Sequence, residues 1–189
     1  MFFEFWEFPK LSTRGQQKLS TSRKKVEPKT IFDCSSFGAY SFEKNIDLIH
    51  KTNYLSLIEI FETLEYHDIS AYIHAGSSSE YGLNSASPSE DSPLIPNSQY
   101  AISKAAASNA ITFYGKIKKF PVVNLRLYSV YGPYEDSSRL IPVLCEKTLE
   151  KSLPQFADKE VSRDFIYIDD VVDAFIASAW DALCSENLP

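Results

Sequence analysis

The stretch Ala71-Tyr72-Ile73-His74-Ala75-Gly76-Ser77-Ser78-Ser79-Glu80-Tyr81-Gly82 joins a short apolar run to a cluster of serines that ends in glycine. An apolar run of this length, followed by turn-forming residues, is typical of a buried strand and its exit loop. Comparable runs lie at 30–34 and 122–127, and an extended segment is expected at 163–168. The sequence therefore predicts several short, buried strands.

Helical patterns separate these strands. Apolar residues recur at three- and four-residue steps in 43–66, and small residues that permit close packing mark 98–118. Two more helices are expected, one over 140–151 and one that ends near Leu183, with Asp169 or Asp170 as its N-cap.

Because the strands alternate with helices and are apolar on both faces, the sequence predicts an α/β fold with a parallel, helix-covered sheet. Functional residues of such sheets gather at the carboxyl ends of the strands. The serine cluster and a Tyr/Gly/Pro loop at 128–133 both fall at strand ends in this prediction.

The helix predicted at 43–66 has one polar member in its apolar stripe. That stripe consists of Ile46, Ile49, Asn53, Leu57, Ile60 and Leu64. A buried amide must find hydrogen-bond partners or it destabilises the fold. Asn53 therefore either satisfies a nearby backbone group or orders water or a side chain at a functional site.

Composition narrows the class of protein. The 189 residues are 44% apolar and 14% aromatic, which indicates a globular chain with a real core. A net charge of -6 argues against nucleic acid as a partner. No run approaches the ~20 apolar residues of a membrane span. The scattered cysteines (Cys34, Cys145, Cys184) have no metal-ligand spacing and indicate reduced thiols in a cytoplasmic protein.

Residues 1–29 differ from the rest of the chain. An aromatic cluster interrupted by two glutamates is followed by a polar, basic stretch without periodicity, and neither resembles a signal peptide. We interpret 1–29 as a flexible leader and 30–189 as the folded domain.

Tyr100 and Lys104 lie four residues apart at the start of the helix predicted at 98–118, and so share one face of it. A cation beside a phenol favours the phenolate, which can act as a general base. The hydroxyl of Ser77, predicted as the first residue past the preceding strand, is expected close to both. Together these groups suit proton removal from an alcohol as its hydride departs, although serine runs more often form simple turns.

Four segments carry a family resemblance. They are Ser77–Gly82 (SSSEYG), Pro96–Lys104 (PNSQYAISK), Asn124–Pro133 (NLRLYSVYGP) and Ser162–Asp170 (SRDFIYIDD). In this order and spacing they resemble the extended short-chain dehydrogenase/reductase family, the NAD-dependent nucleotide-sugar epimerases and dehydratases. The resemblance covers roughly residue 30 to the C-terminus. It implies a partial Rossmann-like parallel sheet, with the start of a substrate-binding region.

The resemblance also implies roles for individual residues. Tyr100 would be the catalytic acid or base, Lys104 would stabilise its phenolate and bind the nicotinamide ribose, and Ser77 would bind the reacting sugar hydroxyl. NAD or NADP contacts are implied for Ser35, Ser36, Phe37, Asn53, Tyr128, Ser129 and Val130. Contacts with a nucleotide-sugar substrate are implied for Ser78, Ser79, Asn97 and Arg163. Arg163 suits phosphate oxygens, but an ion pair on the surface is an equal reading.

The chain departs from the family pattern in its glycines. None of Gly15, Gly38, Gly76, Gly82, Gly115 and Gly132 is spaced to make the glycine-rich loop of a first βαβ unit. We therefore read the chain as a family fragment, with a second copy or a complementing N-terminal piece as its partner. A non-catalytic remnant and a ligand- or partner-binding α/β module are the alternatives.

A second departure concerns the reaction. In the 4,6-dehydratases an acid follows the catalytic hydroxyl directly, whereas here Ser78 and Ser79 occupy those positions and Glu80 comes one step later. One step along a strand turns a side chain to the opposite face. This arrangement favours epimerase or reductase chemistry over dehydration.

We expect the isolated chain to bind NAD weakly or not at all, because no glycine-rich loop supplies backbone donors for the pyrophosphate. Isothermal titration calorimetry with NAD measures this directly. Dissociation constants in the low-micromolar range would contradict the expectation.

Overall fold

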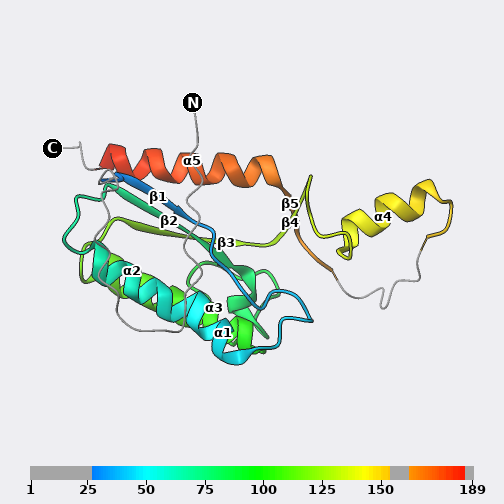
Figure 1. The fold of residues 1–189 in the computed structure, drawn as a ribbon, viewed down its shortest axis with the longest axis horizontal. Helices are drawn as coiled ribbons and strands as arrows, with labels where there is room; N and C mark the ends of the chain where they lie inside the picture. Colours follow the sequence, from blue (N-terminus) through cyan, green and yellow to red (C-terminus); the bar gives the residue numbers. More distant parts are fainter. Residues whose placement is uncertain (1–26, 154–161, 186–189) are drawn as a thin grey trace, which may run out of the picture.

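The computed structural model describes residues 27–153 and 162–185. At its centre lies a three-stranded sheet made of β1 (Thr30–Asp33), β2 (Ala71–Ser77) and β3 (Val122–Leu127). The strands follow the order β1-β2-β3, and both neighbouring pairs are parallel. Their carboxyl ends therefore meet at one edge of the sheet (Figure 1).

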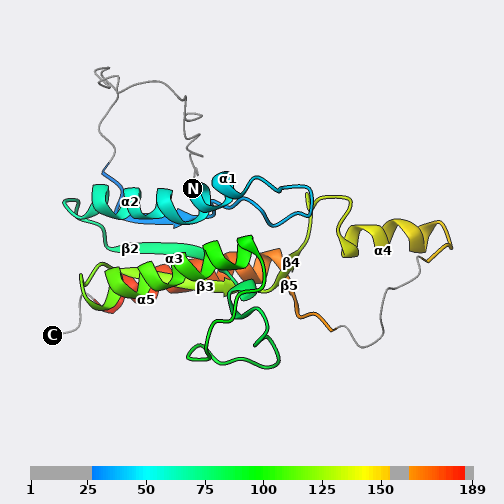
Figure 2. The same cartoon turned by 90° about the horizontal axis from the view of Figure 1, so that it is seen from below.

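Helices cover both faces of this sheet. One face carries α1 (Ile46–His50), the π-helical segment η1 (Lys51–Leu55), α2 (Ser56–Leu64) and α3 (Gln99–Lys116). The other face carries α5 (Ile168–Ser185). Figure 1 shows α2 and α3 together on one side and α5 on the other, and Figure 2, seen from below, shows α2 and α3 in front of the sheet. The predicted α/β layering is confirmed.

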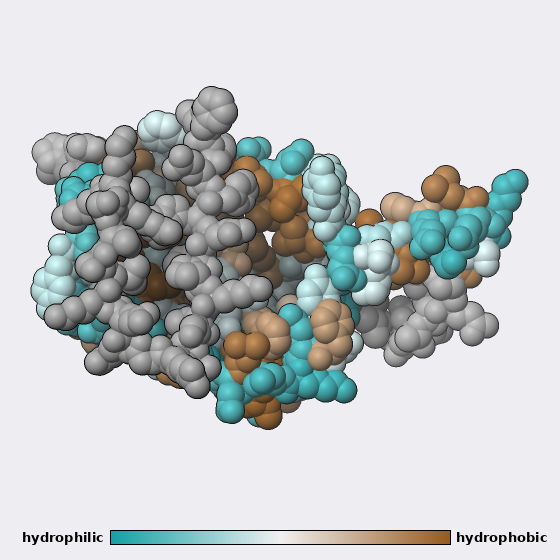
Figure 3. Space-filling model, in the orientation of Figure 1, coloured by the Kyte–Doolittle hydropathy of each residue, from teal (hydrophilic) through white to brown (hydrophobic). Residues whose placement is uncertain are grey.

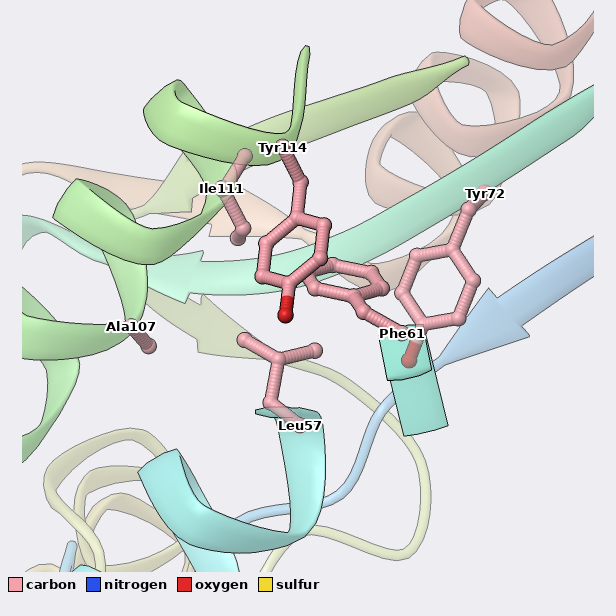
Figure 4. Packing of buried hydrophobic residues seen from close by; sticks show 6 residues of the cluster. All are labelled: Leu57, Phe61, Tyr72, Ala107, Ile111 and Tyr114. Carbon is pink, nitrogen blue, oxygen red and sulfur yellow. The ribbon is translucent and has the colours of Figure 1, made fainter. Parts of the chain in front are cut away.

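The core on the α2/α3 face is aromatic. Phe61 is fully buried, and its ring lies 5.1 Å from that of Tyr72 and 4.7 Å from that of Tyr114, between centroids. Figure 4 shows these three rings gathered between α2, α3 and the sheet, with Leu57 and Ile111 beside them. A second cluster fills the α5 face and consists of Ala71, Ile73, Val171, Phe175 and Ala179.

The remaining elements lie beyond the carboxyl ends of the strands. A 3-10 turn, η2 (Ser78–Tyr81), follows β2 directly. Short strands β4 (Ser129–Tyr131) and β5 (Phe165–Tyr167) form a separate parallel pair. Helix α4 (Leu140–Leu149) has no buried residue and stands away from the body, with apolar and polar side chains exposed along it (Figure 3).

Three details of the prediction were wrong. The segment predicted as a loop at 128–133 contains β4, because its backbone pairs with β5. Ser77 is the last residue of β2 and does not lie beyond it. Helix α5 begins at Ile168, so Asp169 and Asp170 lie in its first turn, where their charge favours the helix N-terminus, and do not cap it.

The helix predicted at 43–66 is one helical run of three parts. It begins at Ile46, where the side chain of Asn45 accepts a hydrogen bond from the backbone of Leu48. The buried members recur every four residues: Ile49, Asn53, Leu57 and Phe61. Ile46 is half exposed, and the fully buried Phe61 replaces the expected Ile60 as the main core residue. The wider hydrogen-bond step of η1 accounts for this shift of face.

Some expectations concern other parts of the chain. Most of the leader expected at 1–29 lies outside the described residues. Cys34, Cys145 and Cys184 are all free and exposed, as expected of reduced thiols. Over the part that the structure describes, we find no helix both long and apolar enough to cross a membrane, and no cluster of metal-ligating side chains.

Replacing Phe61 with alanine should destabilise the fold by about 3–5 kcal/mol, because the cavity would open among three other aromatic rings. Urea denaturation followed by circular dichroism measures the change. Phe113→Ala, on the exposed side of α3, is the matched control and should cost far less. Equal losses in the two variants would contradict the assignment of Phe61 to the core.

Candidate active site

The loops and side chains singled out in the sequence meet at the carboxyl edge of the sheet. Ser35–Phe37 follow β1, Ser77 ends β2 and Tyr128 follows β3. The 3-10 turn after β2 packs against α3, the helix that bears Tyr100 and Lys104. The sheet topology therefore brings segments far apart in sequence to one place.

Lys104 is the most deeply buried of the predicted catalytic residues, with 1% of its surface exposed. Its Nζ donates a hydrogen bond of 3.0 Å to the backbone oxygen of Ala75 in β2. Burial lowers the pKa of its ammonium, while the nearby charges of Asp33 and Glu80 act in the opposite sense. An ammonium has three donors, and within the described ranges only this one bond engages them. The other two donors have no partner among the described residues.

Ser77 keeps a free donor. Its Oγ accepts a hydrogen bond of 3.2 Å from the backbone N–H of Ser79, as the N-cap of the 3-10 turn. A hydroxyl carries one donor and two acceptor lone pairs, so this bond leaves the O–H of Ser77 able to donate to a substrate oxygen. Ser77 is half-buried, which keeps the hydroxyl within reach of a ligand.

Tyr100 lies half-buried in the first turn of α3, which Ser98 caps through the backbone of Ala101. The fully buried Ser103 donates to the backbone oxygen of Tyr100 at 2.7 Å. No described residue forms a hydrogen bond with the phenol hydroxyl, so it is open to an external partner.

Asn53 joins three segments through its amide. Oδ1 accepts from the backbone N–H of Phe37 at 2.8 Å, while Nδ2 donates to the backbone oxygen of Phe37 at 2.8 Å and to Oγ of Ser103 at 2.9 Å. Asn53 therefore satisfies backbone groups and holds the Ser103 side chain, whereas a role at a functional site stays a prediction. The amide fixes the loop after β1 relative to the start of α3.

A buried acid and imidazole form a second polar cluster beneath this edge. Asp33 accepts hydrogen bonds from the hydroxyl of Tyr72 at 2.9 Å and from Nδ1 of His74 at 2.8 Å. Burial by itself raises the pKa of Asp33, but hydrogen bonds and charge from His74, with help from Ser35, hold it well below its usual range. Asp33 is therefore ionised, and we assign a proton to Nδ1 of His74.

Among the buried polar atoms that have no hydrogen-bond partner within the described residues, two belong to neighbouring strands at this cluster. They are Nε2 of His74 and Oδ1 of Asn124, and the two residues are register partners across β2 and β3. The Asn124 amide lies over Gly76, where an added Cβ would meet Oδ1 at 2.3 Å. Glycine at position 76 therefore makes room for this amide.

Glu80 is fully buried, but the expectation that it turns away from the serines was wrong, because residues 78–81 form a 3-10 turn that folds its carboxylate back onto Ser77. Its carboxylate binds Nε of Arg126 and the backbone N–H of Ser77. Asn97 and Arg163 are exposed. Arg163 is next to Asp164, whose backbone oxygen accepts from the N–H of Ser129 at 3.0 Å. Arg163 thus lies beside the segment Tyr128–Val130, whereas its direct contact with a phosphate stays a prediction.

Several residues of this site carried no role in the sequence analysis. They are Asp33, His74, Ser103, Ser108 and Arg126. Ser103 has a detectable signal, because it lies three residues after Tyr100 on the same helix, within reach of its backbone oxygen. For Asp33 and His74 the signal is a polar, ionisable residue within each of two apolar strands, since buried polar groups need partners.

The unpaired hydrogen-bond donors at this edge of the sheet suit the ribose and nicotinamide end of a dinucleotide cofactor. Lys104 presents unpaired donors at a buried position, which fits vicinal ribose hydroxyls. Asn53 holds the loop Ser35–Phe37 and also binds Ser103, the residue before Lys104. The residues present therefore fit this end of the group.

The Asp33→Asn variant should unfold more readily at neutral pH, by about 1–3 kcal/mol, because it loses a charged hydrogen-bond acceptor. The pKa of Asp33 is lower in the folded than in the unfolded chain, so its contribution is present above ~3.9 and is lost as the pH falls. Urea titrations from about pH 7 to about pH 3 should show the difference between variant and wild type shrinking. Asp91→Asn, in an exposed loop, is the control; a constant difference for Asp33→Asn would contradict the pairing.

Relatives and solved structures resemble large parts of the chain. An uncharacterized UDP-glucose epimerase of Bacillus subtilis is 32% identical over 126 residues, 66% of this chain and 40% of that protein. The UDP-glucuronic acid 4-epimerase of Bacillus cereus, solved with UDP-glucuronic acid and NAD, superimposes with a TM-score of 0.70 at 28% identity, over 79% of this chain and 49% of that one. The dTDP-glucose 4,6-dehydratase of Bacillus anthracis, solved with NAD, gives 0.66 at 26% identity, over 79% and 46%.

The chain spans about half the length of these proteins. The family model for NAD dependent epimerases and dehydratases matches residues 5–181, nearly the whole sequence. With the parallel sheet and the Tyr100/Lys104 helix already in place, this match shows that the chain belongs to the NAD-dependent epimerase/dehydratase family.

Proposed function

We propose that this chain carries the proton-transfer and sugar-binding part of an NAD-dependent nucleotide-sugar epimerase. The observation that carries the proposal is the position of Lys104. Its buried ammonium is fixed to the end of β2 and lies one helical turn from Tyr100, while Ser77 ends the same strand with a free O–H. Epimerases acting on UDP-sugars are among the proteins that the chain resembles.

Each of the three side chains has a distinct task in this proposal. The phenolate of Tyr100 takes the proton from a sugar hydroxyl and later returns it. The O–H of Ser77 donates to the same sugar oxygen and orients it. Lys104 stabilises the phenolate and, through its unpaired donors, holds the ribose of the cofactor. When bound, NAD supplies a reversible acceptor for the hydride of the sugar carbon.

Further contacts are part of the proposal. Ser35–Phe37 and Tyr128–Val130 flank the cofactor on the two sides of the strand end, and Asn53 holds the first of these segments. Ser78, Ser79, Asn97 and Arg163 contact the nucleotide sugar, with Arg163 on its phosphates.

The burial of Glu80 supports epimerisation over dehydration. A 4,6-dehydratase needs an acid beside the reacting sugar to expel water, whereas Glu80 is fully buried and binds Arg126 and the backbone of Ser77. Ser78 and Ser79 offer no acid in its place. The resemblance to dTDP-glucose 4,6-dehydratase makes dehydration the second candidate.

The proposed partner is a piece on another chain that supplies a glycine-rich dinucleotide-binding unit, or alternatively a second copy of this chain in a homodimer. The outer edge of β1 supports this proposal, because within the described residues β1 pairs only with β2. An unpaired strand edge accepts a further parallel strand.

The Tyr100→Phe variant tests the proposed chemistry. The chain, alone and co-expressed with an N-terminal dinucleotide-binding half of a relative, is assayed for cofactor reduction and epimer formation with UDP- and dTDP-sugars. Tyr100→Phe should lower kcat by about 10²–10⁴-fold and leave sugar-nucleotide binding intact. Tyr134→Phe, at a fully exposed position, is the control. Turnover by Tyr100→Phe at the wild-type rate would refute the proposal.

A further inference from the structure

Arg126, near the end of β3, uses four of its five N–H groups on three different segments. Nε donates to Oε2 of Glu80 at 2.8 Å, and Nη1 donates to the hydroxyl of Tyr81 at 3.1 Å and to the backbone oxygen of Glu90 at 2.8 Å. Nη2 donates to Oγ of Ser108 at 3.0 Å. The guanidinium also lies over the ring of Tyr81, 5.0 Å from its centroid. One side chain thus connects β3, the turn after β2, the loop at 83–97 and α3.

Glu80 links Arg126 to the backbone of Ser77. Its Oε2 binds Arg126, while its Oε1 accepts from the backbone N–H of Ser77 at 2.9 Å. The side chain of Ser77 in turn accepts from Ser79, which completes a capping box. The orientation of the Ser77 backbone therefore depends on a carboxylate whose two oxygens are both engaged.

Ser108 links Arg126 to α3, the helix that bears Tyr100 and Lys104. It is buried, and its Oγ accepts from Arg126 and from Nδ2 of Asn124 at 3.2 Å. Ser108 lies one helical turn beyond Lys104, on the same face of α3. Arg126 therefore holds Ser77 and the Tyr100 helix to the same guanidinium.

Stabilisation of the fold by the Arg126–Glu80 ion pair explains this arrangement less well than positioning does. A buried ion pair is often no more stabilising than packed apolar side chains of similar size. What apolar side chains cannot do is fix two backbone segments at set angles, as the planar fork of Arg126 does for Glu90 and, through Glu80, for Ser77.

We propose that Arg126, acting through Glu80, is a positioning residue that sets the Ser77 hydroxyl and the loop at 83–97 relative to α3. The proposal rests on the proposed function for its catalytic consequence, but the ordering of residues 77–97 is measurable without activity. In a site of this kind the loss of Arg126 lowers kcat more than it raises the KM for the sugar nucleotide.

Amide hydrogen exchange of the full chain, read by mass spectrometry, tests the ordering. Arg126→Lys keeps the charge and loses the fork, and should speed exchange over residues 77–97 by at least about tenfold, the equivalent of one charge-assisted hydrogen bond. Exchange in α2 and in residues 71–75 should stay unchanged. Unaltered exchange at 77–97, or acceleration spread evenly over the chain, would overturn the proposal.

Glu80→Gln is the second variant, in case Arg126→Lys does not fold. Both carboxylate oxygens accept hydrogen bonds, so an amide places a donor against a donor and should speed exchange in the same residues. Glu65→Gln, which breaks the exposed pair with Lys118, is the control and should leave 77–97 unchanged. The same acceleration in Glu65→Gln would also overturn the proposal.

Kinetics separates this proposal from the proposed function. If the wild-type chain with its complementing piece turns over sugar nucleotides, Arg126→Lys should lower kcat by about 10–100-fold, with KM and the pH profile nearly unchanged. A KM effect alone would refute positioning. If the wild-type chain turns over none of the sugars, the proposed function fails, and the exchange data alone decide the role of Arg126.

Discussion

The hydrogen bond from Nζ of Lys104 to the backbone oxygen of Ala75 is the contact on which the site depends. It fixes α3 to β2 two residues before the strand ends at Ser77. Tyr100 is one turn back along the helix, so this single bond limits how far the phenol and the hydroxyl can move apart. An ammonium that has lost its water must keep such a partner, because an unpaired buried charge is strongly destabilising.

The same requirement explains why so many polar groups are buried along this edge. Asn53, Ser103, Asp33, His74 and Glu80 are each held by partners within the chain. The bonds of Asn53, Asp33 and Glu80 join segments that are distant in sequence. A parallel sheet brings these segments together at one edge, and the buried polar bonds then fix the angle at which they meet.

Much of the fold could be predicted from the sequence. The three strands of the central sheet were predicted within two residues, because runs such as Thr30–Asp33 and Val122–Leu127 are apolar and bounded by turn residues. The short strand β4 was missed, since its pairing with β5 depends on residues more than thirty positions away. The displacement of Ile60 by Phe61 was missed for a local reason: a uniform helical period does not anticipate the wider turn η1.

The candidate site could be predicted only at the level of residue types. Tyr100, Lys104 and Ser77 were singled out because their spacing and strand-end positions carry a signal. The supporting residues Ser108 and Arg126 were not, because they are unremarkable in sequence and acquire a role only through contacts between α3 and the sheet. Sequence patterns identify groups that can react, whereas the residues that orient them depend on tertiary geometry.

The turn η1 has a consequence for protein engineering. Asn53 lies within it and is a poor helix former, so a search for thermostable variants based on helix propensity would select leucine or alanine there. Such a variant would leave the Phe37 backbone and Ser103 without their amide partner. At this one position the cost of unsatisfied buried groups exceeds the gain in helix propensity, so a change chosen to strengthen the helix would weaken the fold and release the loop at 35–37.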